Sequence, residues 1–448
     1  MKFTVLSAIV ATLLLGTLDA LSLPGPSNNP ASQFMGIKVV RIPTGPSTSA
    51  LSKLKDLISK YDLDLWTTVP TINSHVDVEV PSASYGSFMK ETNGLLSQAG
   101  ILEPVSIMHE DLGQSILEES AVSDEYQNQM RKAGILATPA WFNAYHPYAD
   151  HLQFLSDLAA AYPSRAKVVT GGTSTQGRPI KGINIFGSSG SGVKPAIIWH
   201  ANVHAREWIT SMTAEYMAYK LLTNYGNSTE IKGYVDKYDF YIFPVVNPDG
   251  FVYSQTTNRM WRKNRQSPPS GSSCYGRDIN RNWDIHWSDP GGASTNPCDD
   301  TYKGTAPFDA SETRTLAAFL NAKKNSTQGM KMYIDWHSYS QMFFTPYGWT
   351  CTQLPPDYTE LLALAKGFTT SLKAVYGTTY TYGPSCSTIY KTTGSSDDYI
   401  YGVTGVKYSF SAELRDKGTY GFVLPANQIY PTGIETWAGV KYLLANMT

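Results

Sequence analysis

Apolar and polar positions in the first quarter of the chain repeat with the period of a strand in some stretches and with that of a helix in others. Residues 76–80 read VDVEV, a period of two that is typical of a strand with one buried face. Residues 49–61 place leucine and isoleucine at helical spacing. Further strands are predicted at 37–42, 64–68 and 104–109, and a second helix at 85–96. The order βα-ββ-αβ predicts a ferredoxin-like α+β open sandwich over residues 34–110.

Longer apolar runs follow from residue 137 onward, and amphipathic stretches separate them. The runs that predict buried strands are 196–199, 240–246, 332–336 and 406–412. The stretches that predict helices are 150–162, 215–222, 312–321 and 360–375. Gly177-Arg178-Pro179 indicates a hairpin within 173–185. Strands interleaved with helices predict one large α/β domain with helices on both faces of its sheet.

The first 20 residues have the pattern of a secretory signal. A basic residue at Lys2 precedes an apolar run over 5–15, and Ala20 is a small residue at a plausible cleavage position. The run is short for a membrane span, and no other long apolar stretch follows. We therefore expect a secreted, extracellular protein that has no membrane anchor once residues 1–20 are removed.

Residues 111–134 predict a polar, helix-prone connector between the two units. It contains Arg131-Lys132, a basic pair placed just before Gly134. Exposed loops of this kind are where proteases cut chains, so an activating protease is one expected partner. The alternative is an ordinary interdomain linker.

Charge and cysteine content narrow the class of protein. The chain has 36 basic and 37 acidic residues, so no basic surplus suggests a nucleic-acid partner. Its four cysteines, Cys274, Cys298, Cys351 and Cys386, allow three pairings and form no C-x-x-C motif. We expect two structural disulfides in an oxidising compartment. Asn227, Asn325 and Asn446 begin glycosylation triplets.

Candidate chemistry lies where two predicted strands end. His204 and Glu207 follow the strand at 196–199, and His337 follows the strand at 332–336. Two imidazoles and a carboxylate are zinc ligands, and a catalytic zinc site needs three protein ligands with one open position. Carboxyl ends of strands are also where α/β active sites lie. The alternative for the first pair is a strand-end histidine and a glutamate that caps a helix.

Seven motifs occur in an order that resembles one family. They are HAREW at 204–208, NPDG at 247–250, NRMWRK at 258–263, DINRNW at 278–283, HSY at 337–339, TIY at 388–390 and ELRD at 413–416. Together they resemble the carboxypeptidase A/B family of zinc metallocarboxypeptidases, from about residue 137 to the C-terminus. The preceding unit is similar to the activation domain of that family.

The resemblance implies a secreted zymogen with a propeptide over 21–132 and a catalytic domain over 137–448, built on a mixed central sheet. It implies one Zn²⁺ held by His204, Glu207 and His337, with Asp278 orienting the first histidine. Glu413 would take a proton from the attacking water and return it to the leaving amine. Arg262 would stabilise the oxyanion.

The resemblance also implies how a peptide is bound. The residues that match the grip on the terminal carboxylate are Asn280, Arg281 and Tyr390, and those that match other subsites are Arg206, Tyr339 and Phe422. The implied disulfides are Cys274–Cys298 and Cys351–Cys386, and cis peptide bonds are implied at Ser338–Tyr339, Pro346–Tyr347 and Arg415–Asp416. We expect a monomer that acts on the C-termini of peptides and proteins.

Specificity depends on Asp397, which stands seven residues after Tyr390, at the position that matches the pocket base. An acid there is similar to family members that remove Lys or Arg, and a buried carboxylate needs a cation. In the alternative, Asp397 points to solvent, Asp398 holds the loop, and the preference is A-type or mixed. Two other classes stay open: an inactive peptide-binding protein and a zinc deacylase. Glu312 and Asp335 are interpreted as structural acids.

Overall fold

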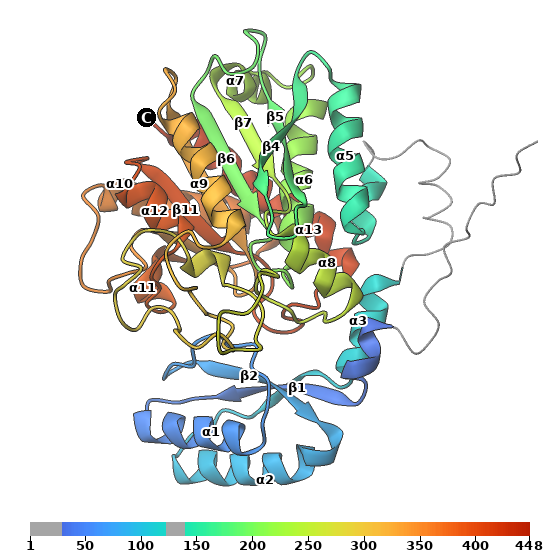
Figure 1. The fold of residues 1–448 in the computed structure, drawn as a ribbon, viewed down its shortest axis with the longest axis vertical. Coiled ribbons are helices and arrows are strands. Elements are labelled where there is room, and N and C mark those ends of the chain that lie inside the picture. The colour runs from blue at the N-terminus through green and yellow to red at the C-terminus, as the bar shows by residue number, and fades with distance from the viewer. Residues whose placement is uncertain (1–28, 122–138) are drawn as a thin grey trace, which may run out of the picture.

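The computed structural model describes residues 29–121 and 139–448, which form a small and a large unit (Figure 1). Within these residues, no helix is long and apolar enough to cross a membrane. The small unit lies at the bottom of the view, with β1 and β2 toward the large unit and α1 and α2 on the far side. The signal predicted at 1–20 and the cut at Arg131-Lys132 lie outside the described residues.

The small unit is a three-stranded antiparallel sheet in the order β2-β1-β3. Its strands are β1 (Ile37–Pro43), β2 (His75–Pro81) and β3 (Ser106–His109). Its helices are η2 (Pro30–Phe34), α1 (Thr48–Lys60), α2 (Ser82–Gln98) and α3 (Leu112–Ser120). The two long helices follow the predicted ranges closely, because their leucines and isoleucines pack on Val40, Ile42 and Val78 in one core.

One expected strand, 64–68, is wrong. Only Leu65 bridges to β2, opposite Val78, although Trp66 N still donates to Asp77 O at 2.9 Å. The chain leaves the sheet edge because Trp66 is buried against Phe422 of the large unit, with ring centroids 5.4 Å apart. The open sandwich therefore keeps the predicted order of its other elements, but the strand expected at 64–68 is a single β-bridge between Leu65 and Val78.

The polar positions of β2 are buried. Val76, Val78 and Val80 face the helices as the period of two predicts, but Asp77 and Glu79 are also almost fully buried. Their face of the sheet lies against the large unit, where the Tyr339 hydroxyl donates to Asp77 Oδ2. The polar residues of the VDVEV pattern therefore face the large unit and not solvent.

The large unit is built on an eight-stranded mixed sheet in the order β10-β9-β11-β8-β6-β7-β5-β4. The strands are β4 (Ala166–Thr173), β5 (Pro179–Ile185), β6 (Ala196–Ala201), β7 (Asp239–Phe243), β8 (Met330–His337), β9 (Met342–Thr345), β10 (Thr381–Pro384) and β11 (Tyr408–Glu413). β4 and β5 form the predicted antiparallel hairpin, with Gly177 at φ 84° in its turn. The short strands β9 and β10 were not predicted.

Helices cover both faces of this sheet, as expected (Figure 1). The helices are η3 (Pro139–Asn143), α5 (Tyr148–Ala161), α6 (Trp208–Thr223), α7 (Thr229–Lys237), α8 (Pro248–Thr256), η4 (Ile279–Arg281), α9 (Ser311–Lys324), α10 (Tyr358–Tyr376), α11 (Ser385–Thr388), α12 (Ser396–Gly402), η5 (Ala426–Gln428) and α13 (Ile429–Asn446). Alternate residues of β6 enter two cores. Ile197 and Trp199 pack with α5, α6, α10 and α13, whereas Ala196 and Ile198 pack with α9 and α12.

The order of the parallel strands places the site. β6, β8 and β11 are neighbours and run parallel, so their carboxyl ends meet at one edge. His337 ends β8 and Glu413 ends β11, and the two are direct register partners. The three cis peptide bonds implied by the resemblance are present, at Ser338–Tyr339, Pro346–Tyr347 and Arg415–Asp416.

Candidate active site

The turn after β6 brings His204 and Glu207 to the edge where His337 lies. Asn202 takes a positive φ of 55° there, and its side-chain amide donates to the carbonyls of His204 and Glu207 at 3.4 Å. Glu207 directly precedes α6, but its carboxylate makes no cap hydrogen bond. The helix-capping alternative is therefore wrong, and the carboxylate points to the two histidines instead.

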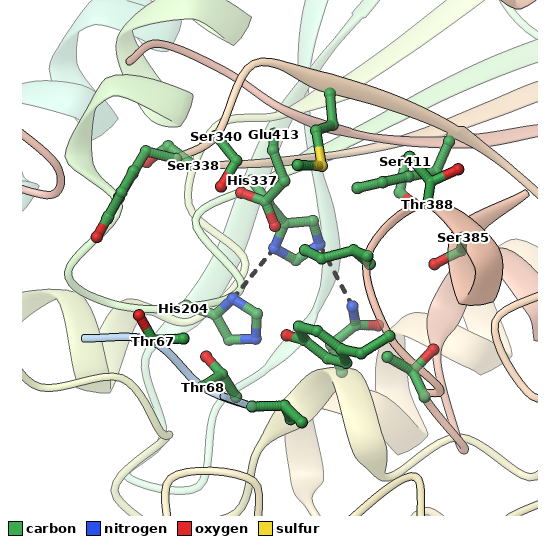
Figure 2. Close-up of a pocket in the computed structure, with 18 of the residues that line it drawn as sticks. Thr67, Thr68, His204, His337, Ser338, Ser340, Ser385, Thr388, Ser411 and Glu413 are labelled. Atoms are coloured by element: carbon green, nitrogen blue, oxygen red, sulfur yellow. Dashed lines mark hydrogen bonds between the residues drawn. The ribbon is translucent and has the colours of Figure 1, made fainter. Parts of the chain in front are cut away.

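The three side chains converge on one point and are all buried. Figure 2 shows His204 and His337 side by side at this point, with Glu413 next to His337. His204 Nδ1 lies 2.8 Å from Glu207 Oε1, and His337 Nδ1 lies 3.3 Å from Glu207 Oε2. The two Nδ1 atoms are 3.1 Å apart. Among the described residues this is the one group of histidine, cysteine or acidic side chains that could hold a metal ion.

The Nε2 atom of each histidine, which points away from the convergence point, faces a carboxylate. His204 Nε2 lies 3.1 Å from Asp278 Oδ1, as expected, and His337 Nε2 lies 3.3 Å from Asp335 Oδ2. A carboxylate accepts a proton donor, so each ring is favoured with hydrogen on Nε2 and a free lone pair on Nδ1. Two imidazole nitrogens and one carboxylate oxygen are a donor set that fits zinc.

The charges around this point favour a cation. Burial alone would raise the pKa of Glu207, but His204 and His337 hold it below its ordinary value. Burial alone would lower the pKa of His337, but Asp335 and Glu207 raise it well above its ordinary value. Positive charge is thus stabilised between these side chains, which is what a bound Zn²⁺ requires.

Glu413 and Arg262 flank the same point. Glu413 is half-buried, and its Oε2 is a buried atom that has no hydrogen-bond partner among the described residues. Burial, then the charge of Glu207, raises the pKa of Glu413 to about 8. Arg262 donates to Asp278 Oδ2 at 2.8 Å and lies 3.9 Å from Glu207. A proton acceptor and a fixed cation therefore stand beside the three converging ligands.

The residues expected to grip a terminal carboxylate line the same cavity, whose volume is about 450 Å³. Arg281 is buried, its Nη1 donates to Asn280 O at 2.7 Å, and its Nε has no partner among the described residues. Tyr390 is half-buried and also lines the cavity. These donors lie beside the convergence point, in reach of one bound ligand.

The small unit closes the mouth of this cavity. Its residues 66–69, 71–75 and 77 line the cavity together with His204 and Glu413, and Thr67 and Thr68 appear beside His204 in Figure 2. Trp66 packs on Phe422, and Phe422 packs edge-on to Tyr339 with centroids 4.8 Å apart. The Arg206 guanidinium lies 4.2 Å from the Phe422 ring. Two of the expected subsite residues, Tyr339 and Phe422, are therefore in contact with Trp66 of the small unit, and Phe422 in turn contacts Arg206.

Asp397 lies in the wall of the cavity and does not point to solvent. Ser411 Oγ donates to Asp397 Oδ2 at 3.0 Å, and no lysine or arginine of the described part of the chain forms an ion pair with it. Asp398 holds the neighbouring loop, because its carboxylate accepts from Gly348 N and Trp349 N at 2.9 and 3.0 Å. A Cβ at Gly348 would lie 2.2 Å from Thr392 Oγ1, which explains the glycine.

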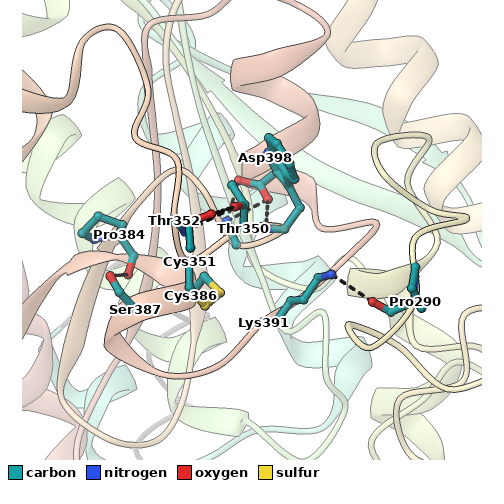
Figure 3. The surroundings of a disulfide bond; sticks show 11 residues. Pro290, Thr350, Cys351, Thr352, Pro384, Cys386, Ser387, Lys391 and Asp398 are labelled. Carbon is teal, nitrogen blue, oxygen red and sulfur yellow. Dashed lines mark hydrogen bonds between the residues drawn. A yellow bond between two sulfur atoms is a disulfide. The ribbon is translucent and has the colours of Figure 1, made fainter.

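Disulfides fasten two loops near the site. The pairs Cys274–Cys298 and Cys351–Cys386 are those that the resemblance implies. Figure 3 shows the second disulfide, in which Cys386 belongs to α11. The backbone N of Cys386 donates to Tyr347 O at 3.0 Å. Ser385 and Thr388 of the same short helix line the cavity, so the second disulfide ties one cavity wall to the loop held by Asp398.

Other buried acids and histidines separate into two groups. Glu312 accepts from Thr175 N and Asn264 and not from any of the three converging side chains, which agrees with a structural role. His146, His151 and His200 lie in the core and hydrogen-bond to Trp141 O, Glu215 and Tyr333. Asp335, in contrast, touches a ligand histidine. The sequence held a signal for this contact, because Asp335 stands two residues before His337 on a predicted strand and residues at that spacing share one face.

Comparisons with known proteins agree with this geometry. The family model of zinc carboxypeptidases matches residues 151–439, and that of the carboxypeptidase activation peptide matches 46–119. Metallocarboxypeptidase A of Trichophyton rubrum is 43% identical over 412 residues, covering 92% of this chain and 93% of the relative. Carboxypeptidase A2 of Mus musculus is 41% identical over 386 residues, covering 86% and 87%.

Solved structures give the same result for the fold. The crystal structure of thrombin activatable fibrinolysis inhibitor superposes with a TM-score of 0.81 at 28% identity, covering 92% of this chain and 99% of that one. Carboxypeptidase A from Helicoverpa armigera has a TM-score of 0.76 at 25% identity, covering 92% and 98%. Both similarities extend over the small and the large unit.

Proposed function

Because the chain belongs to the zinc carboxypeptidase family, a family of zinc-dependent exopeptidases, we propose that His204, Glu207 and His337 hold its zinc ion and that Glu413 is the catalytic base. The observation that carries this is the convergence of two Nδ1 atoms and one carboxylate beside a buried, unpartnered Glu413 oxygen. A bound zinc ion supplies Lewis acidity to the scissile carbonyl and to the attacking water.

The protein's own residues would transfer the proton, stabilise the oxyanion and orient the first histidine. Glu413 takes the proton of the water whose oxygen adds to the carbonyl carbon, and it passes that proton to the amine as the C–N bond breaks. Arg262, fixed by Asp278, faces the oxygen that becomes negative and stabilises it in a site with little water. Asp278 also keeps the His204 proton on Nε2.

Restriction to the last peptide bond is assigned to Asn280, Arg281 and Tyr390. These side chains supply a guanidinium, an amide and a phenol in one cavity. A free carboxylate can accept hydrogen bonds from all three groups, whereas a blocked C-terminus cannot. This grouping favours an exopeptidase over a deacylase. The inactive-binder alternative would be favoured by loss of Glu413, Arg262 or a ligand, and all are present.

We propose that the protein is a secreted zymogen. The activation-peptide match and the coverage of the cavity by Trp66–Asp77 support this, with a signal at 1–20 and a cut near Arg131-Lys132 that leaves a catalytic domain of 137–448. Two disulfides support an oxidising compartment. Asn227, Asn325 and Asn446 are exposed, as glycan attachment requires.

For the released residue we propose Lys or Arg, because Asp397 is a buried cavity carboxylate without a lysine or arginine partner among the described side chains. The second candidate is an apolar residue. Relatives with more than 40% identity are named metallocarboxypeptidase A and carboxypeptidase A2, and burial raises the pKa of Asp397, which favours its neutral form.

Exopeptidase action is tested with three versions of one peptide on the activated protein: free, amidated at the C-terminus, and free with its amino group acylated. The first and third should lose one C-terminal residue and the amidated peptide should stay intact. Release of the acyl group would identify a deacylase. Binding without any cleavage would identify an inactive peptide-binding protein.

A further inference from the structure

The structure places a second carboxylate, Asp335, against the metal-ligand histidine that Asp278 does not touch. Asp335 stands on β8 two residues before His337, so both side chains project from the same face of the strand. Both are buried, and Asp335 Oδ2 lies 3.3 Å from His337 Nε2. Asn280 Nδ2 is also 3.4 Å from that nitrogen, but an amide nitrogen cannot accept a hydrogen bond. Asp335 is therefore the acceptor for the Nε2 proton.

A single residue, Ser396, connects this carboxylate to the amide of Asn280. Ser396 Oγ donates to Asp335 Oδ2, and Ser396 N donates to Asn280 Oδ1 at 2.9 Å. The second bond fixes the amide, because its oxygen is occupied by a backbone donor. Its Nδ2 then points toward His337 and the cavity, where it can donate to a ligand carboxylate.

The surroundings of the two carboxylates differ. Asp278 is paired with Arg262 as well as with His204. Asp335 has no arginine or lysine partner among the described residues, and its Oδ1 has no hydrogen-bond partner there. The protons it accepts come from His337 and Ser396. Its Oδ2 is therefore held by these two donors, and hydrogen on Nε2 leaves the Nδ1 lone pair of His337 free for a metal ion.

We propose that Asp335 is a positioning residue that sets the tautomer and ring orientation of His337, and that Ser396 couples it to the Asn280 amide that holds the substrate carboxylate. The inference rests on the proposed zinc site. Because outer partners of metal-ligating histidines raise metal affinity by holding the ring, loss of Asp335 should weaken zinc binding about 10- to 100-fold.

The test measures zinc affinity by competition with a chromogenic chelator, on the full chain. Asp335→Asn keeps the size of the side chain, and Glu312→Gln is the matched control, a buried carboxylate of the same unit that touches no ligand. Asp335→Asn should bind zinc at least tenfold more weakly, while the control keeps wild-type affinity. Equal affinity in wild type and Asp335→Asn would overturn the proposal.

Ser396 gives a second measurement if Asp335→Asn does not fold. Ser396→Ala should weaken zinc binding severalfold and raise KM for peptides with a free C-terminus, and Ser396→Thr, which keeps the hydroxyl, should restore both. Unchanged zinc affinity in Ser396→Ala would contradict the coupling. A wild-type chain that binds no zinc at all would instead refute the proposed function.

Discussion

Glu119 and Arg259 form a buried ion pair that ties the last described helix of the small unit, α3, to the cleft of the large unit. Arg259 Nε lies 2.6 Å from Glu119 Oε2, and its Nη2 lies 2.8 Å from Oε1. The same guanidinium donates to Arg206 O and Phe422 O at 2.7 Å. The pair thus holds the small unit at the residues expected to form peptide subsites.

Glu119→Ala should loosen the small unit strongly. Removing one partner of a buried ion pair costs about 3–5 kcal/mol, because the other charge is left buried and unpaired. The variant should unfold at lower denaturant concentration and be activated faster by a trypsin-like protease. Glu118→Ala is the control, since Glu118 is exposed on the same helix. Indistinguishable behaviour of the two variants would mean that the pair does not fasten the zymogen.

The docked zymogen should be less stable at alkaline pH. Burial at the interface raises the pKa of Glu79 to about 7. The negative charge of Asp64 adds to this rise, and the hydrogen bond from the Trp66 indole opposes it. A raised pKa stabilises the docked state fully below the ordinary value of 4.5, and this stabilisation is lost as pH rises through 7. The slope is at most about 1.4 kcal/mol per pH unit.

Size-exclusion of the cleaved but undissociated zymogen measures this effect. More of the small unit should stay bound at pH 5.5 than at pH 8, and Glu79→Gln should bind equally at both. Asp64, Asp300 and Arg206 also act on Glu79, so a slope that persists in Glu79→Gln would assign the dependence to them.

Asp397→Ile should change which C-terminal residue is released. Losing the carboxylate should lower kcat/KM for peptides ending in Arg or Lys by more than tenfold, about 1.4 kcal/mol, and spare or improve those ending in Phe or Leu. Steady-state kinetics with all four peptides checks the ranking. A wild-type enzyme that already prefers Phe and Leu would establish the apolar alternative.

Removal of zinc should abolish turnover, and its return should restore it. The expected ligands lie on a turn and a strand end of a packed sheet, so the fold around them does not depend on the ion for its core. Chelation should therefore leave far-UV circular dichroism unchanged. Full activity in a metal-free preparation would be incompatible with the proposed site.

The main fold and the convergence of the proposed metal ligands could be predicted because they follow local rules. Trp199 and Ile334 lie in apolar runs that give the central strands, and parallel neighbours bring His204 and His337 to one edge. The short strands β9 and β10 were not predicted, because each has only four residues and so few positions cannot show an alternation of apolar and polar side chains.

Contacts between the two units could not be predicted from local pattern. Glu79 in a period-two strand reads as solvent-facing, and the Trp66 indole that donates to it at 2.7 Å lies in a stretch that resembled a strand. Both depend on the opposing surface of Phe422 and Tyr339, which is far away in the sequence.

The most direct test of the account is to measure turnover and zinc content together in activated wild type and Glu413→Gln. Both proteins should hold one zinc ion, because Glu413 is not among the three converging ligands. Loss of the base should lower kcat on a peptide with a free C-terminus by about 10²- to 10⁴-fold. A zinc-loaded Glu413→Gln enzyme that hydrolyses the peptide at the wild-type rate would contradict the account.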